Sequence, residues 1–277
     1  MDNKDISEVI VGIVEGLMNR VMERVLVEDP FIPEKHHAAK PIYAALVPDE
    51  IFKGAHFERR FVTPFGNTWE KLALASANVY HSHGSKGQTI EGTIGEERLR
   101  RIQEVLNRLE HGVASEKKAT PNWTEEIEYI LKGEGPAVPV AVVCDIYVDS
   151  QLTKKKYAFE LKGPLPNSDQ TKVSKEKMFK LMAMNEHPVD YAYYALPYNP
   201  YGNRQSYNWA FPQRWFDMKN DECVLIGREL WDVIGGVGTY DKFISEINKL
   251  GVEYKERIYR EYLGIEPPIG FDSNRMK

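Results

Sequence analysis

Two neighbouring strand-like segments constrain the fold most strongly. The first reads Val138-Pro-Val-Ala-Val-Val-Cys-Asp-Ile-Tyr-Val148, an apolar and β-branched run that predicts a buried strand. After a polar turn with lysines at 154–156, Tyr157-Ala-Phe-Glu-Leu-Lys162 alternates in polarity, and Gly163-Pro164 ends it. This second segment predicts the partner strand.

Hydrophobic periodicity predicts the other elements. Long amphipathic helices are expected over 6–26 and 240–263, and strands over 191–196 and 223–226. Further helices are expected at 67–80, 99–109, 122–131, 171–185 and 228–233. A loop is expected up to Pro41, followed by short helical pieces up to a turn at Pro64-Phe-Gly-Asn67, and another loop is expected over 82–95. The pattern indicates an α/β fold, with a mixed central β-sheet flanked by helices and a helical N-terminal half.

Composition narrows the class of protein. The 277 residues are 42% hydrophobic and 28% charged, which suits a globular domain, and no apolar stretch is long enough to span a membrane. The N-terminus lacks the pattern of a secretory signal, so we expect a cytoplasmic protein. The net charge of −5 argues against coating nucleic acid through bulk positive charge. Cys144 and Cys223 lie in apolar runs and suit small buried side chains.

Three charged residues on the two strands form the candidate site. Asp145 lies in an otherwise apolar strand, where an ionised carboxylate is costly unless a cation or hydrogen bonds compensate it. Glu160 and Lys162 share a face of the next strand, because side chains two residues apart point the same way. If the strands pair, the carboxylates and the Leu161 carbonyl could bind Mg²⁺ for phosphodiester hydrolysis, with Lys162 orienting water or stabilising negative charge.

The spacing alone does not decide the matter. Asp145 could simply end a strand, and Glu160 and Lys162 could form an exposed pair of little energetic value. Chance matches to such a pattern are common in a chain with 28% charged residues. The downstream sequence is needed to choose between these alternatives.

A resemblance reaches beyond the three charged residues. Asp145 followed by Phe159-Glu-Leu-Lys-Gly-Pro-Leu-Pro-Asn-Ser-Asp-Gln-Thr-Lys-Val-Ser-Lys-Glu-Lys-Met178 resembles the PD-(D/E)XK nucleases, specifically the TdeIII-type type II restriction endonucleases. Similar features are Pro64-Phe-Gly-Asn-Thr-Trp-Glu70, Tyr198-Asn-Pro-Tyr-Gly202 and Leu225-Ile-Gly-Arg-Glu-Leu-Trp-Asp232, so the resemblance covers most of the chain. One departure is Cys144, which stands where the motif has proline.

The resemblance carries several implications. It implies a single restriction-endonuclease-like domain over 1–277, with a catalytic core at about 134–235 and a helical part at about 1–133. It also implies Mg²⁺-dependent cleavage of double-stranded DNA at a short palindromic site, GGNCC-like for this family. A palindrome suits a homodimer, and a companion methyltransferase acting on the same site without a stable complex is the expected partner.

Further site residues are candidates with open alternatives. Glu70 could complete metal binding or could be an ordinary helix-surface residue. A polar loop leading into a helix could contact the DNA backbone, or could be a solvated helix face; its residues are Asn167, Asp169, Gln170, Lys172, Lys175 and Lys177. A second polar segment could read bases, or could be a surface loop anchored by Trp209, Phe211 and Trp215; its residues include Asn203, Arg204, Gln205, Asn208 and Arg214.

Two other functions remain open at this point. A repair or recombination nuclease of the same fold would cut by DNA structure rather than sequence. A nuclease-like fold could also serve as a DNA-binding module that does not cleave. Discrete fragments from a defined plasmid would separate the restriction enzyme from both.

Overall fold

The computed structural model describes residues 5–111 and 119–273. The chain divides into two compact units, one formed by Met1–Leu72 with Asp241–Lys277 and the other by Ala73–Tyr240. Within the described residues, none of the helices combines the length and apolar character that a bilayer crossing requires.

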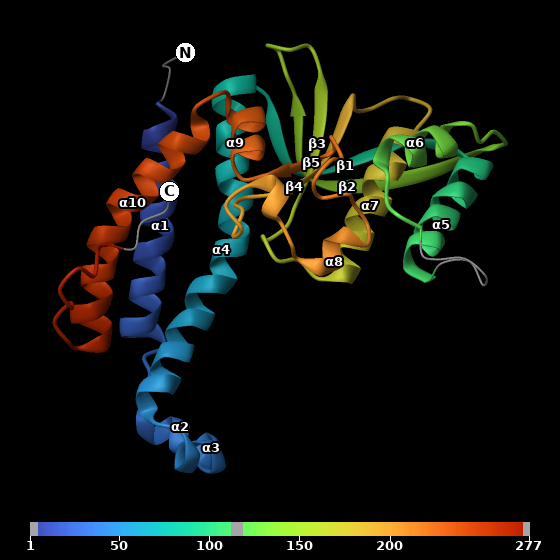
Figure 1. The fold of residues 1–277 in the computed structure, drawn as a ribbon. Helices are drawn as coiled ribbons and strands as arrows, with labels where there is room; N and C mark the ends of the chain where they lie inside the picture. The colour runs from blue at the N-terminus through green and yellow to red at the C-terminus, as the bar shows by residue number, and fades with distance from the viewer. Residues whose placement is uncertain (1–4, 112–118, 274–277) are drawn as a thin grey trace. The chain divides into compact units, whose positions relative to one another are not determined.

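A five-stranded mixed sheet forms the centre of the second unit (Figure 1). Its strands lie in sequence order: β1 (Gly84–Gly95), β2 (Ala137–Asp149), β3 (Lys156–Leu161), β4 (Tyr191–Leu196) and β5 (Val224–Ile226). β1–β2 and β2–β3 pair antiparallel, whereas β3–β4 and β4–β5 pair parallel. The mixed sheet flanked by helices is therefore confirmed, as are the two adjacent strands that carry the candidate site.

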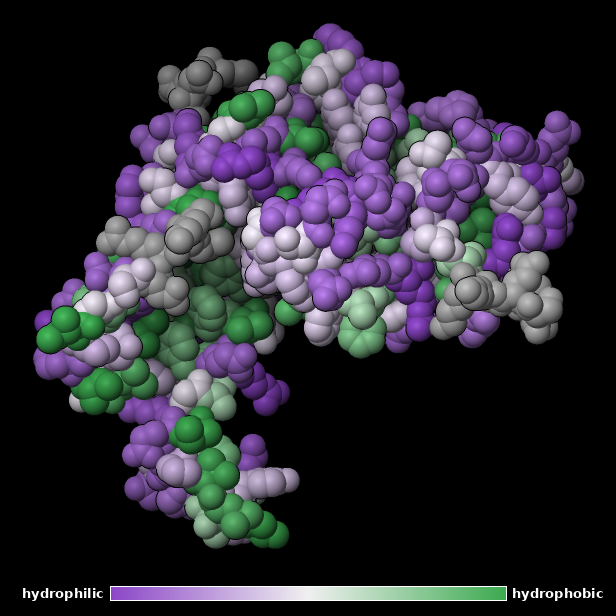
Figure 2. Space-filling view, viewed as in Figure 1, coloured by the Kyte–Doolittle hydropathy of each residue, from purple (hydrophilic) through white to green (hydrophobic). Residues whose placement is uncertain are grey.

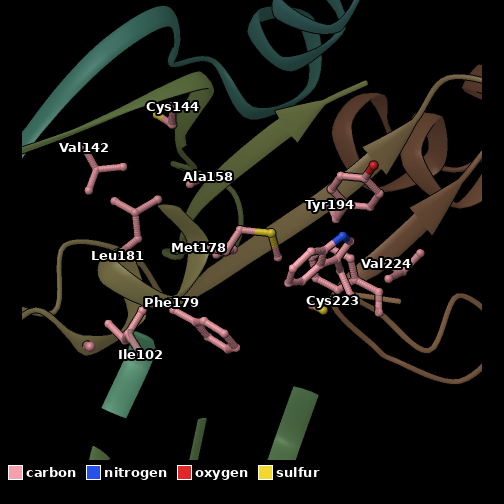
Figure 3. Close-up of a cluster of buried hydrophobic side chains, with 14 of the residues drawn as sticks. Ile102, Val142, Cys144, Ala158, Met178, Phe179, Leu181, Tyr194, Cys223 and Val224 are labelled. Atoms are coloured by element: carbon pink, nitrogen blue, oxygen red, sulfur yellow. The ribbon is translucent and has the colours of Figure 1, made fainter. Parts of the chain in front are cut away.

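Helices of the second unit cover the sheet. They are α5 (Glu96–His111), α6 (Trp123–Leu131), α7 (Ser168–Ala183), α8 (Ala210–Gln213) and α9 (Arg228–Gly235), with a 3-10 turn η2 (Arg204–Ser206). Met178 and Phe179 of α7 belong to a buried cluster with Ala158 of β3 and Tyr194 of β4 (Figure 3). Cys144 and Cys223 are buried free thiols, as expected from their apolar surroundings. The packing of α7 against the sheet fixes which of its side chains reach the strands.

The segment expected to be a loop over 82–95 is instead strand β1. It carries several glycines and polar residues, and its apolar side chains are Ile90 and Ile94, so it lacks the alternation of a half-buried strand. Its pairing with β2 runs from Gly84 opposite Val148 to Gly95 opposite Ala137. Backbone hydrogen bonds to a strand distant in sequence, rather than local propensity, make this segment extended.

The first unit is helical. It contains α1 (Ile6–Glu23), the π-helical turn η1 (Arg24–Glu28), α2 (Pro33–Ala39), α3 (Pro41–Leu46) and most of α4 (Asp49–His81). From the end of the chain it adds α10 (Thr239–Arg257), apart from its first two residues, and the π-helical turn η3 (Ile258–Leu263). The Tyr254 hydroxyl donates to Asn19 Oδ1 at 2.9 Å and so links α10 to α1. The amphipathic helices predicted at both ends of the chain are confirmed.

Two expectations for this region were wrong. The Pro- and His-rich segment expected to be a loop through Pro41 contains helix α2, whereas α3 agrees with the short helical pieces expected after it. Each of the two helices begins with proline, a residue well suited to the first helical turn. The expected turn at 64–67 lies inside the continuous helix α4, with Pro64 in its interior. An aromatic row at four-residue spacing spans this proline, with rings packed from Phe57 to Phe61, Phe65 and Trp69.

Hydrophobic side chains are also exposed on the first unit. Ile42, Tyr43 and Leu46 on α3 and Ile51 on α4 are each more than half exposed. Figure 2 shows this hydrophobic surface over α3 and the start of α4, whereas the visible face of the second unit is mostly hydrophilic.

Lys175 is part of the core rather than a DNA contact. Its side chain is 0% exposed, and its ammonium donates to the Trp215 carbonyl and lies 2.6 Å from Glu126 Oε2, an ion pair without hydrogen-bond geometry. Burial raises the pKa of Glu126 although Lys175 opposes that shift. An ammonium held inside the protein in this way cannot contact a phosphate, so the expected backbone contact of Lys175 is corrected.

We expect Lys175→Met to destabilise the protein by about 3–5 kcal/mol, because it leaves the buried Glu126 without its cation. Urea unfolding of the variant measures this loss. Adding Glu126→Gln should recover part of it, and Lys180→Met, on the exposed side of the same helix, should change the unfolding free energy by less than about 1 kcal/mol. Unchanged stability together with lost DNA affinity would restore the DNA-contact interpretation.

Candidate active site

The strand pairing is interrupted at Asp145. β2 and β3 pair up to Ile146 opposite Phe159, and the β1–β2 register skips Asp145 and its opposite residue Gly87, whose φ is +63°. Asp145 Oδ2 accepts a hydrogen bond from the Leu161 amide at 2.8 Å, where a regular ladder would offer a main-chain carbonyl. The carboxylate is therefore tied to the end of β3.

Lys162 lies where three oxygen groups converge. Its Nζ is 3.0 Å from Asp145 Oδ2, 2.9 Å from the Leu161 carbonyl oxygen and 3.6 Å from Glu160 Oε2. The side chains of Asp145 and Lys162 are each 20% exposed, so the group can be reached from solvent. The expected convergence of Asp145, Glu160 and Lys162 is confirmed.

A second ammonium, from α7, completes the cluster. Lys177 Nζ lies 2.9 Å from both Glu160 Oε1 and Glu160 Oε2, and 3.9 Å from Asp145 Oδ1. Its side chain is 27% exposed, whereas that of Glu160 is 1% exposed. Two carboxylates, the Leu161 carbonyl and two ammonium groups thus form one cluster where the β2–β3 pairing stops, which we call the site cluster.

Burial and, to a smaller extent, the neighbouring Asp145 charge raise the pKa of Glu160 from 4.5 to about 7. Lys162 and Lys177 act in the opposite direction and favour the ionised carboxylate. A carboxylate that is almost fully buried and close to another acid depends on nearby cations to stay charged. The Glu160 charge is therefore sensitive to the cations around it.

The segment after β3 is held by aromatic residues from a distant part of the chain. The Tyr207 hydroxyl donates to the Pro164 carbonyl at 2.8 Å, and the Trp209 indole donates to the Pro166 carbonyl at 2.8 Å. The Trp215 indole donates to Ser168 Oγ at 3.0 Å. These three hydrogen bonds fix the chain between the site cluster and α7, so anchoring by Trp209 and Trp215 is confirmed. Phe211 is 50% exposed and packs edge-on against Trp209.

The oxygen atoms of the site cluster fit the chemistry of Mg²⁺. Asp145, Glu160 and the Leu161 carbonyl surround a single position that a cationic nitrogen, Lys162 Nζ, occupies. Mg²⁺ prefers hard oxygen ligands and commonly takes a few carboxylates, with water and phosphate completing its shell. Among the residues that the structure describes, no group of three or more His, Cys, Asp or Glu side chains could hold a metal ion. The donor set is thus two carboxylates and one main-chain oxygen.

Glu70 and this donor set belong to different units of the chain. Glu70 is on the part of α4 that belongs to the first unit, whereas the site cluster belongs to the second. Its role in metal binding stays a prediction.

Most of the expected DNA-contacting residues lie at the surface. Those that are exposed are Asn167, Asp169, Gln170, Asn203, Gln205, Asn208 and Arg214. Asn167 also caps α7, since its Oδ1 accepts from the Gln170 amide at 2.8 Å. Lys172 is paired with Glu110. Their contacts with DNA stay predictions.

Arg204 has a structural role in this arrangement. Its guanidinium donates to Glu229 Oε2 at 2.9 Å and to the Met218 carbonyl at 3.2 Å, and also to the Asp221 carbonyl. These contacts use its fork of donors inside the protein. Reading a guanine through the same donors would require breaking them.

From the sequence, Lys175 and Lys177 are both expected among the lysines that neutralise the DNA backbone, and Lys177 is not linked to the site. The buried residues Thr171, Ser174, Lys175 and Met178 follow the three-and-four spacing of a core-facing helix stripe, a signal that separates Lys175 from Lys177. No local spacing in the sequence predicts that Lys177 reaches Glu160.

Comparison with known proteins identifies a family for this chain. Residues 3–251 match a family model described as "Type II restriction endonuclease, HinfI". The type II restriction enzyme HgiCII of Herpetosiphon aurantiacus is 26% identical over 229 residues, covering 81% of this chain and 82% of the relative. HgiEI of the same organism is 25% identical over 270 residues, covering 93% and 96%. A chain that matches this family model over most of its length belongs to the HinfI family of type II restriction endonucleases.

Proposed function

We propose that the protein is a Mg²⁺-dependent type II endonuclease that hydrolyses phosphodiester bonds of double-stranded DNA at a short palindromic site. The observation that carries this proposal is the convergence of Asp145, Glu160 and the Leu161 carbonyl on Lys162 Nζ. Family membership favours it over a structure-specific repair nuclease and over a DNA-binding module that does not cleave.

Each residue of the site cluster has a distinct role in the proposal. Asp145, Glu160 and the Leu161 carbonyl would hold the metal, which supplies a more acidic bound water and neutralises charge on the phosphate. Lys162, which already lies beside these oxygens, would orient the attacking water or stabilise negative charge on the reacting phosphate. Asp145 also fixes the end of β3 through the Leu161 amide, so ligand position and strand geometry are coupled.

We assign this chemistry to the PD-(D/E)XK type, with Cys144 in place of the motif's proline; the TdeIII-type grouping stays a prediction. DNA backbone contacts are proposed for the N-terminal part of α7, with Asn167, Asp169, Gln170 and Lys172. Base reading is proposed for Asn203, Gln205, Asn208 and Arg214, which are exposed on the segment that anchors the chain after β3.

The proposed recognition sequence is GGNCC-like and palindromic. Two-fold symmetry of such a site matches a homodimer, in which each protomer cuts one strand. A companion DNA methyltransferase would protect the same site without forming a stable complex with this protein. Glu70 remains a proposed fourth acidic group at the metal.

Cleavage mapping tests the proposal directly. We expect digestion of unmethylated phage DNA with Mg²⁺ to give discrete fragments whose sequenced ends share one short palindrome. EDTA should abolish cutting. Fragments that end at DNA junctions or flaps, or binding with no cutting at any Mg²⁺ concentration, would rule the proposal out.

We expect Asp145→Asn, Glu160→Gln and Lys162→Met each to lower the cleavage rate by at least about a hundredfold, because each removes a ligand or the charge nearest the reacting phosphate. Single-turnover cleavage assays measure the rates, and circular dichroism checks the fold. Asp190→Asn serves as the control, since Asp190 pairs with Lys155 at the opposite end of β3. A variant of the site cluster that cuts at the parent rate does not belong to the catalytic centre.

Metal-free stability should depend on pH through Glu160. Because its folded pKa of about 7 lies above the ordinary 4.5, the folded protein binds more protons than the unfolded chain between these values. Its contribution to the unfolding free energy should therefore fall as pH rises from about 4.5 to 7, by up to about 3 kcal/mol, and stay constant above that range.

Denaturant unfolding in EDTA at several pH values measures this dependence, and Glu160→Gln should flatten it. Mg²⁺ competes with the proton, so it should raise the melting temperature more at pH 8 than at pH 5.5. Equal stabilisation at both pH values would exclude Glu160 as a ligand.

A further inference from the structure

Lys177 holds both oxygens of the buried Glu160. Its Nζ lies 2.9 Å from Oε1 and 2.9 Å from Oε2, while Lys162 is bound to Asp145 and the Leu161 carbonyl. The oxygens that could receive a metal ion are therefore occupied by ammonium groups from two different elements. A metal ion must displace them, or share these oxygens with them.

The charges of the site cluster sum to zero when both acids are ionised. Two carboxylates are balanced by two ammonium groups, and Glu160 is 1% exposed. Adding a divalent cation brings the cluster to a net charge of two positive units in a partly buried place, which is costly in a medium less polar than water. A DNA phosphate supplies both a compensating negative charge and new acceptors for a displaced lysine.

Lys177 is partly accessible to solvent, as such a transfer requires. Its side chain is 27% exposed, and its flexible stem carries the ammonium 3.9 Å from Asp145 Oδ1, at the solvent-accessible side of the cluster. The other α7 lysines are engaged elsewhere: Lys172 pairs with Glu110, Lys175 with Glu126 and Lys180 with Glu176. Lys177 is thus the α7 lysine whose ammonium group lies beside the proposed metal ligands.

We propose that Lys177 is a positioning residue that holds Glu160 in the DNA-free protein and passes its ammonium to a DNA phosphate as the metal enters. Metal affinity is then low without DNA and rises when DNA binds, so that metal loading is coupled to the substrate. This inference rests on the proposed function, because it takes Glu160 to be a metal ligand. It adds that DNA binding controls when the metal ion enters the site.

The test measures divalent-cation affinity without cleavage. Ca²⁺, which also prefers oxygen ligands, is titrated calorimetrically into the DNA-free full-length protein and into its complex with a duplex that carries the mapped site. For the parent we expect weak binding without DNA and markedly tighter binding with it.

Lys177→Met should lower the Ca²⁺ dissociation constant of the DNA-free protein by about tenfold, since one nearby positive charge is removed. The difference in affinity between the DNA-free and DNA-bound states should shrink in the same variant. Lys177→Arg, which keeps the charge, should behave like the parent. Lys180→Met is the matched control, because its side chain is 29% exposed on the same helix and pairs with Glu176.

Unchanged or weaker Ca²⁺ binding by Lys177→Met would overturn the inference, as would the same gain in affinity from Lys180→Met. If Lys177→Met does not fold by circular dichroism, Lys177→Gln is measured in its place. Failure of the proposed function has a different signature: the parent would not cut DNA with Mg²⁺ at all. A parent that cuts, with a Lys177→Met variant of parental Ca²⁺ affinity, removes the coupling and leaves the endonuclease intact.

Discussion

The Glu160 carboxylate is almost completely removed from water, and the surrounding elements have to keep it charged there. β2 brings Asp145 beside it, the end of β3 supplies Lys162, and α7 adds Lys177. Burial and the neighbouring acid raise the pKa of Glu160 to about 7, and the two cations oppose that shift. The register of two strands and the placement of one helix are therefore tied to a single charged group.

The sequence predicted the parts of the sheet in which local pattern and tertiary contacts agree. β2, β3 and β4 are rich in apolar, β-branched or aromatic residues and were located correctly. β1 was missed because its glycines and polar residues carry little local preference, and its extended form depends on pairing with β2. The helix predicted here begins only at residue 67, because Pro64 locally disfavours a helix interior. The helix α4 instead continues through Pro64, and the aromatic row from Phe57 to Trp69 spans it.

Prediction of the site followed the same division. The proximity of Asp145, Glu160 and Lys162 could be predicted, because two adjacent strands carry them and side chains two residues apart on a strand point the same way. The link between Lys177 and Glu160 could not, because the three-and-four spacing places Lys175 on the core-facing stripe of α7 but does not predict which strand residue the other lysines of the helix reach. Lys175 consequently lies in the core, whereas Lys177 reaches Glu160.

The hydrogen bonds from Tyr207, Trp209 and Trp215 to the chain after β3 join two segments with separate proposed tasks. The chain between Pro164 and Ser168 leads from the site cluster into α7, and the residues that hold it alternate with the exposed polar side chains of the 203–214 segment. Insertions or deletions in that segment would move the aromatic anchors along with the polar surface. If these exposed side chains read bases and the site cluster cleaves DNA, as proposed, exchange of the side chains can change the DNA preference, while changes in the length of the segment would also disturb the catalytic residues.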